Sequence, residues 1–492
     1  MVFSNSVFLL LFLPIAIAVY YLLMICRADI RIRNTWLLLI SLGFYAWGEP
    51  YCVFLMMLSI LLNHLFGIWV EKYAKQPKGK RIVAYACVYN LGQLFFFKYL
   101  GWVLGLFIGA GIKDTFIGRI ALPIGISFYT FQALSYVIDV YRGKDKAQHS
   151  ILNTGLYIAF FPQLIAGPIV RYHSIAEQLQ QREHSIDKFS EGVWRFCIGL
   201  SKKAILANHL SILSDIAFSR APSQLSALLA WVGALCFMLQ IYYDFSGYSD
   251  MAIGLGKMFG FEFQENFNYP YISLSVTEYW RRWHISLGEW FRDYLYYPLT
   301  FGPAVRLRKR LGKKVSRKTA SKIAAAAVLF CVWLATGIWH GANVTFIVWG
   351  LIQFLFIFWE QNRKPIKNHS LSIAVGFTTT FLVVLLTKVI FKSTSMTQAF
   401  HYYGSMLCLE GNPLFDAFAL YWIREFRFFI AAGILFIFPV VPWLRNRVDG
   451  QNRQWVKHLY HTAAFAAMAV MLAMDILYAV IGEYNPFLYF NF

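Results

Sequence analysis

Two histidines carry the acid–base chemistry that this sequence offers. His340 lies in a long apolar segment between Gly337 and Gly341, and His284 lies in the charged run Glu278–Asp293. An imidazole titrates near neutral pH and can take a proton from a hydroxyl group. An ionisable side chain inside an apolar segment marks a functional site by default. We therefore predict that His340 is the catalytic base and that His284 supports it; the alternative for each is a structural histidine bonded to a backbone carbonyl.

The segment 278–294 is predicted to form one amphipathic helix. At helical spacing His284 shares a face with tryptophans and other apolar residues, while charged residues cover the rest. Such a helix is too charged to span hydrocarbon, and it suits a membrane interface or a protein-lined cavity. Arg281 and Arg282, which precede His284, are the candidates for binding an anionic acyl donor.

Three further residues are expected to support the site. Trp339 belongs to a tryptophan-rich wall that would exclude water and protect a reactive thioester from hydrolysis, and Asn343 ends the same run. Asp244 lies, like Asp250, in an apolar segment, where a carboxylate is costly and faces a partner or water. For these two carboxylates we favour a structural role, in which each contacts an arginine or a helix end, over a catalytic role.

The composition is that of a membrane protein. Of the 492 residues, 58% are hydrophobic and only 14% charged, and apolar runs long enough to span or nearly span a bilayer recur along the chain. We predict an all-α, polytopic fold with roughly ten to thirteen membrane segments. No change in composition and no internal repeat divides the chain, so one integral-membrane domain over 1–492 is expected. Pro and Gly in the segments 122–132 and 160–169 predict broken helices. These breaks could form the walls of an internal cavity or could be kinks that allow helix packing, and the sequence favours neither.

The net charge of +20 is explained by membrane topology rather than by nucleic acid. Basic residues gather in the connections between apolar runs, and the positive-inside rule then places both termini on the outer side of the membrane. The most basic stretch is predicted to be a cytoplasmic loop, which would also attract a polyanionic acyl donor such as coenzyme A, or an acidic carrier protein. Its basic residues are Arg306, Arg308, Lys309, Arg310, Lys313, Lys314, Arg317, Lys318 and Lys322.

The sequence predicts neither a metal site nor a bound cofactor. The seven cysteines are scattered without a C-x-x-C pair, and no cysteine or carboxylate cluster completes a zinc site with His284 and His340. Walker, dinucleotide-binding and G-x-S-x-G motifs are absent.

Several motifs together give the chain a family resemblance. The strongest are Trp280–Leu287 and Trp339–Ala342. The others are Met1–Ser4, Leu122–Phe128, Ala166–Ile169, Asp244–Asp250 and Asn266–Tyr271. With these motifs the chain resembles the membrane-bound O-acyltransferases, in the bacterial branch that holds the membrane subunits of alginate and peptidoglycan O-acetylation. The resemblance covers nearly the whole chain and is specific for the family, but much less so for the acceptor.

The resemblance implies a funnel-like helical core with His340 at the base of a tunnel and His284 as the second family histidine. It implies an O-acetyltransferase that takes acetyl from cytoplasmic acetyl-CoA and passes it across the membrane for O-acetylation of a cell-surface polysaccharide. An extracytoplasmic partner, similar to SGNH-type acetyltransferases or esterases, is implied as well. Acyl-relay systems of this family have similar aromatic C-terminal tails, which makes Tyr489 a candidate acyl carrier; an interfacial anchor is the alternative.

Two other functions remain open on the sequence. One is D-alanyl transfer to teichoic acid from a carrier protein, and the other is a polysaccharide exporter without chemistry. Ionisable residues concentrate around the two histidines and do not recur along many helices, which disfavours an exporter. Labelled acetyl-CoA would separate the three functions.

Overall fold

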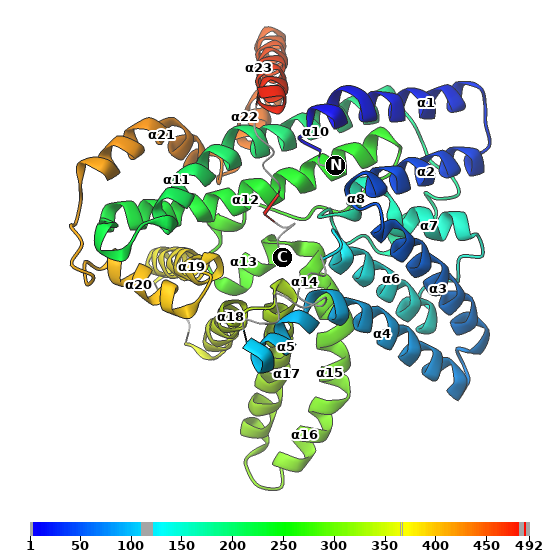
Figure 1. Ribbon diagram of the computed structural model, residues 1–492, viewed down its shortest axis with the longest axis horizontal. Helices are drawn as coiled ribbons and strands as arrows, with labels where there is room; N and C mark the ends of the chain where they lie inside the picture. Colours follow the sequence, from blue (N-terminus) through cyan, green and yellow to red (C-terminus); the bar gives the residue numbers. More distant parts are fainter. Residues whose placement is uncertain (1–2, 110–121, 365, 367, 482–486, 489–492) are drawn as a thin grey trace. The chain divides into compact units, whose positions relative to one another are not determined.

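Helices are the main secondary structure of the described residues. The computed structural model describes residues 3–109, 122–364, 366, 368–481 and 487–488 (Figure 1). Within these residues there is no β-strand, and one isolated antiparallel bridge joins Phe267 to Trp283. The predicted all-α class is confirmed.

Seven of the described helices are long and apolar enough to cross a membrane, or up to nine crossings if each of two bent helix pairs is one span. The seven are Phe8–Ile25, α3 (Cys52–Tyr73), α12 (Ala227–Met258), α17 (Arg317–His340), α18 (Val344–Asn362), α19 (His369–Lys392) and α23 (Gln454–Ile481). The bent pairs are α4 (Pro77–Lys98) with α5 (Leu100–Ile108), and α21 (Ala417–Leu435) with α22 (Val440–Asp449). The number is below the predicted ten to thirteen because some apolar runs, such as 151–170, form short helices that end at breaks.

The chain divides into two compact units that interleave along the sequence. The first holds the described parts of Met1–Leu200, Gly247–Glu265 and Ile476–Phe492, and the second holds Ser201–Ser246 and the described parts of Asn266–Asp475. The single domain over 1–492 and the funnel-like form stay predictions.

The first unit contains most of the N-terminal helices. Besides α3 to α5 they are α1 (Leu13–Ile25), α2 (Ile30–Gly48), α6 (Ile126–Tyr141), α7 (Ile151–Ala159), α8 (Phe161–Leu164), α9 (Tyr172–Ile175) and α10 (Ile186–Ser201). The two predicted breaks meet here: Gly125, with φ of +75°, precedes α6, and a Cβ at Gly125 would lie 2.7 Å from the carbonyl oxygen of Leu164. Close backbone packing therefore accounts for these breaks.

The second unit carries both histidines. Besides α17 to α19 and α21 to α22, it contains α11 (Asn208–Ser219), α13 (Val276–Arg282), α14 (Ile285–Phe291), α15 (Tyr297–Phe301), α16 (Pro303–Leu311) and α20 (Met396–Met406). Two predictions are wrong in this unit. The helix expected over 278–294 is interrupted, because His284 adopts a left-handed conformation with φ of +46° between α13 and α14. The basic stretch expected as a loop is mostly a hairpin of α16 and the start of α17, visible in Figure 1.

Candidate active site

His340 is the last residue of α17, at a close contact between α17 and α18. A Cβ at Gly337 would lie 2.6 Å from the carbonyl oxygen of Phe346, and a Cβ at Gly350 would lie 2.6 Å from the carbonyl oxygen of Trp333. Both helices therefore need glycine where they touch. Gly337, three residues before His340, thus permits the close approach of α18.

The His340 imidazole is buried among aromatic rings. Its ring centroid lies 4.9 Å from that of Trp339, 4.9 Å from that of Trp349 on α18 and 5.2 Å from that of Phe391 on α19, each near edge to face. Only 3% of the His340 surface is exposed. Rings on three sides fix the orientation of the imidazole and exclude water from it, which strengthens electrostatic interactions around it.

His284 is held by the side chain of Asn266. The Asn266 Oδ1 atom accepts hydrogen bonds from the Ser286 backbone N–H at 3.1 Å and the Ser286 hydroxyl at 2.9 Å, and it lies 3.1 Å from His284 Nδ1. Because this oxygen can only accept, Nδ1 must carry the proton of a neutral ring. The Nε2 atom of His284 therefore holds a lone pair.

Burial keeps His284 neutral and its backbone conformation stores strain. Removal from water lowers the pKa of His284 to about 3. A left-handed conformation at a residue other than glycine costs on the order of 1–3 kcal/mol and is concentrated at functional sites. The Trp339 ring lies beside both imidazoles, 5.9 Å from His284 and 4.9 Å from His340 between centroids.

Polar contacts join the helices that carry these rings. The Trp280 indole on α13 donates to Gln353 Oε1 on α18 at 3.1 Å, and Gln353 Nε2 donates to the Thr387 hydroxyl on α19 at 3.1 Å. The Glu360 carboxylate accepts from the backbone N–H groups of Val276 and Thr277 at the start of α13. A carboxylate at a helix N-terminus is stabilising, so α18 fixes both the start and one face of α13.

The other predicted site residues occupy defined positions. Asp244 Oδ1 lies 2.6 Å from the Lys203 ammonium, in an ion pair buried within the second unit. Asn343 caps α18, where its side chain accepts from the Thr345 N–H, and it donates to the Thr394 carbonyl.

The two candidate donor-binding arginines differ in their surroundings. Arg282 forms an ion pair with Glu278 at 2.8 Å, whereas Arg281 is exposed and makes no ion pair with another described residue. Tyr489 lies outside the described residues.

Two residues beside the histidines were not predicted. Asn266 lies 18 positions before His284, and its only signal was membership of the Asn266–Tyr271 motif. Lys388 lies near the end of an apolar run, where lysines ordinarily extend to the membrane surface, and the structure buries it instead.

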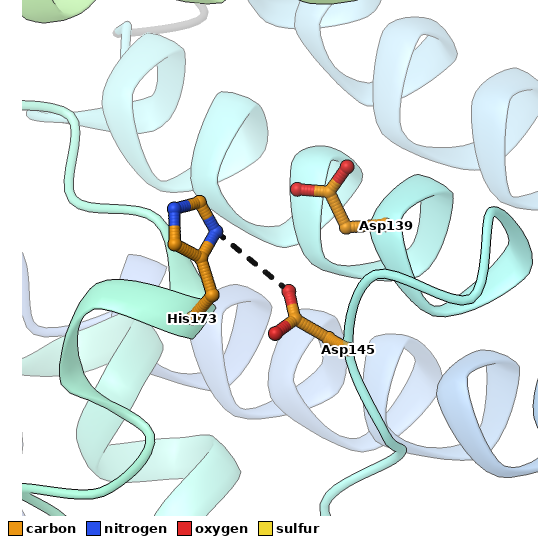
Figure 2. A group of neighbouring side chains, drawn as sticks. All are labelled: Asp139, Asp145 and His173. Atoms are coloured by element: carbon orange, nitrogen blue, oxygen red, sulfur yellow. Dashed lines mark ion pairs between the residues drawn. The ribbon is translucent and has the colours of Figure 1, made fainter.

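One group of side chains in the first unit has ligand types suited to a metal ion. Asp139, Asp145 and His173 place one ligand atom each within 4.8 Å of one another (Figure 2). His173 Nδ1 lies 3.8 Å from Asp145 Oδ2, and Lys144 lies 3.9 Å from Asp139. These ionic contacts give the group a structural explanation.

Comparisons with known proteins assign the family. The model of the membrane-bound O-acyltransferase family matches residues 42–364, which include both histidines. The chain belongs to this family. It is 40% identical to a probable alginate O-acetylase of Pseudomonas syringae pv. tomato over 82% of this chain and 75% of the relative. It is 36% identical to a probable alginate O-acetylase of Pseudomonas putida over the full length of both. It is also 30% identical to a peptidoglycan O-acetyltransferase of Helicobacter pylori over 84% of this chain and 81% of the relative.

The family membership confirms an O-acyltransferase in a multi-pass membrane protein. An O-acyltransferase needs a group that removes a proton from the acceptor hydroxyl. An exporter without chemistry is no longer a candidate.

Proposed function

We propose that this O-acyltransferase takes an acetyl group from cytoplasmic acetyl-CoA and delivers it outward for O-acetylation of a cell-surface polysaccharide. The relatives named for alginate and peptidoglycan O-acetylation support the acetyl group and the polysaccharide acceptor. The observation that carries the proposal is His340, a buried imidazole enclosed by aromatic rings in the matched region.

His340 acts as the general base. It takes the proton from an acceptor hydroxyl as that oxygen forms a bond to the thioester carbonyl carbon, and the carbonyl π electrons move to the oxygen. When the C=O bond re-forms, the C–S bond breaks and the coenzyme A thiolate takes the proton from His340. General base catalysis of this kind contributes about 10²–10⁴ in rate.

His284 supports this step as a neutral hydrogen-bond acceptor. Its Nδ1 proton is directed to Asn266, so Nε2 can accept a hydrogen bond from the acceptor hydroxyl or from ordered water. The depressed pKa makes His284 a weak base, which favours positioning over proton transfer.

The donor enters from the cytoplasmic face, where basic side chains favour an anion. All nine basic residues between Arg306 and Lys322 are exposed on the α16–α17 hairpin. Arg281 can contribute a further charge, since it is exposed and makes no ion pair within the described chain. Arg282 is already paired with Glu278 and supports the donor site less directly.

Tyr489 is the acyl carrier in this scheme. Its phenolic oxygen attacks the thioester carbonyl while His340 takes the phenolic proton, and the acetyl ester of Tyr489 then passes to a polysaccharide hydroxyl on an SGNH-type extracytoplasmic partner. Two acyl transfers with lower barriers then replace one transfer with a high barrier. Phe487, two residues earlier, is buried and packs edge to face on Tyr248 at 4.9 Å between centroids, so the described part of the tail contacts the protein.

Donor choice tests the proposal. Purified protein in liposomes is incubated with labelled acetyl-CoA, or with a D-alanyl carrier protein, and the release of free donor thiol is measured. We expect release from acetyl-CoA alone. Release from the carrier protein alone would contradict acetylation and would favour the function named for the teichoic acid D-alanyltransferase of Bacillus subtilis, 28% identical over 50% of this chain and 61% of the relative.

A further inference from the structure

Three lysines of the second unit are largely buried, and one of them differs from the others. Lys203 lies 2.6 Å from the Asp244 carboxylate, and Lys392 lies 2.6 Å from that of Asp215. Lys388, one helical turn before Lys392 on α19, makes no ion pair with another described residue, although only 3% of its surface is exposed. Among the described residues, Lys203 and Lys392 each lie beside a carboxylate, whereas Lys388 has no carboxylate within ion-pair distance.

Aromatic faces surround the Lys388 ammonium instead. Its Nζ atom lies 4.6 Å from the ring centroid of Trp283, 4.9 Å from that of Phe391 and 5.9 Å from that of Trp349. Each distance falls within the range of a cation–π interaction, which offsets part of the cost of removing a cation from water. A negative charge next to the Lys388 ammonium would offset the rest of this desolvation cost.

The rings around Lys388 also enclose His340. Phe391 lies 5.2 Å from the His340 ring and Trp349 lies 4.9 Å from it, between centroids. The third ring, Trp283, immediately precedes His284 in the chain. A buried cation and the proposed base therefore share two aromatic neighbours in one dry region.

We propose that the Lys388 ammonium stabilises the negative charge that forms on the acyl carbonyl oxygen during transfer at His340. This inference rests on the proposed function. As the hydroxyl oxygen bonds to the carbonyl carbon, its proton goes to His340 and the π electron pair moves to the carbonyl oxygen, where Lys388 donates a hydrogen bond. Collapse of this intermediate restores the C=O bond and expels the thiolate, while Lys388 keeps its protons throughout.

The charge makes this role distinct from a packing role. A lysine that only fills space between the rings can be replaced by methionine, which has a similar length and no charge. A fixed cation that faces developing negative charge lowers the barrier, and the loss of one such donor costs about 10²–10³-fold in kcat.

The test compares Lys388→Met, Lys388→Arg and the control Lys392→Met in the full-length protein. Rates of thiol release are measured against acetyl-CoA concentration, and thermal unfolding is followed in the same detergent. We expect Lys388→Met to lower kcat about 10²-fold or more with KM within about twofold of wild type. Lys388→Arg recovers part of kcat, Lys392→Met keeps it, and the unfolding temperature of Lys388→Met does not fall.

Three outcomes would overturn the inference. One is a kcat of Lys388→Met within a few fold of wild type, and another is a rise in KM alone, which would mean donor binding. The third is a loss of kcat in parallel with a lowered unfolding temperature, which would mean a structural role. If Lys388→Met does not accumulate, Lys388→Gln is judged by the same criteria. If the wild type uses only a D-alanyl carrier protein, the proposed donor is wrong, and the same comparison with that donor still decides the role of Lys388.

Discussion

The two imidazoles differ in their surroundings. His284 is bonded through Nδ1 to an acceptor that also receives two hydrogen bonds from Ser286. His340 is enclosed by rings of α17, α18 and α19. A ring held in one neutral tautomer suits positioning, whereas a ring that can gain a proton suits base catalysis.

The depressed pKa of His284 leads to a prediction about pH. Because this pKa is about 3, His284 is neutral throughout an assay between pH 5 and 9, so His284→Asn should leave the acid limb of the kcat/KM profile in place while lowering its plateau. The pH–rate profiles of wild type and variant check this. A shift of the acid limb would assign the titration to His284 instead.

The same residue makes stability depend on pH. The folded-state pKa of His284 lies below the ordinary histidine value of 6.5, so between about pH 6.5 and 3 the unfolded chain binds a proton that the folded chain does not. Stability from this residue is therefore lost as the pH falls below 6.5, by ~2 kcal/mol at pH 5. His284→Asn should lose less unfolding temperature between pH 7 and 5 than wild type.

At the scale of elements, the break between α13 and α14 is fixed by the extended segment 266–268, whose backbone pairs with residues 282–285. The Ile285 N–H donates to the Asn266 carbonyl at 3.0 Å, and the Asn268 N–H donates to the Arg282 carbonyl at 2.9 Å. The Asn266 side chain adds the contact to His284. Local sequence cannot reveal such a break, because helical spacing is satisfied across residues 278–294 and the contacts come from upstream.

Asn266→Ala should damage both stability and catalysis. The substitution leaves the buried Ser286 N–H without its acceptor, at a cost of about 1–3 kcal/mol, and it frees the tautomer of His284. We expect a lower unfolding temperature and a lower kcat. Asn268→Ala is the matched control, since Asn268 is exposed and its backbone bond to Arg282 is kept. Equal effects of the two substitutions would contradict the role of the Asn266 side chain.

The α16–α17 hairpin allows a test of donor attraction. Replacement of Arg306, Arg308 and Lys309 by Gln should raise the KM for acetyl-CoA with little change in kcat, because these exposed charges act at a distance on an anion. The difference should shrink as salt is added. An unchanged KM at low salt would mean that the basic residues of the hairpin determine only its orientation in the membrane.

At the scale of the whole molecule, the sequence predicted the all-α fold class, which the structure confirms, whereas the catalytic roles of the site residues stay predictions. The apolar runs predicted an all-α membrane protein, and His340 stood out as an ionisable residue between glycines. Seven to nine crossings are found among the described residues, fewer than the apolar runs predicted, because the length of an apolar run does not show where Pro or Gly interrupts its helix. Lys388 was missed because lysines near the end of a membrane helix are ordinary, and only tertiary packing distinguishes it from Lys392.

The relay through the C-terminal tail is a whole-molecule prediction. Tyr489→Phe keeps the aromatic ring and removes only the phenolic oxygen, so it should abolish acetylation of the surface polymer while the protein still inserts in the membrane. Tyr484→Phe is the matched control, as the other phenol of the tail. Normal polymer acetylation in cells that carry Tyr489→Phe would show that the tail is an anchor.

The rate at which purified protein releases thiol from acetyl-CoA, with and without His340, tests the central claim most directly. The comparison uses wild type, His340→Ala and the control His401→Ala, an exposed histidine paired with Glu410. We predict that His340→Ala lowers the rate by about 10² or more at an unchanged unfolding temperature, and that His401→Ala has the wild-type rate. A rate near wild type in a folded His340→Ala protein would contradict His340 as the base.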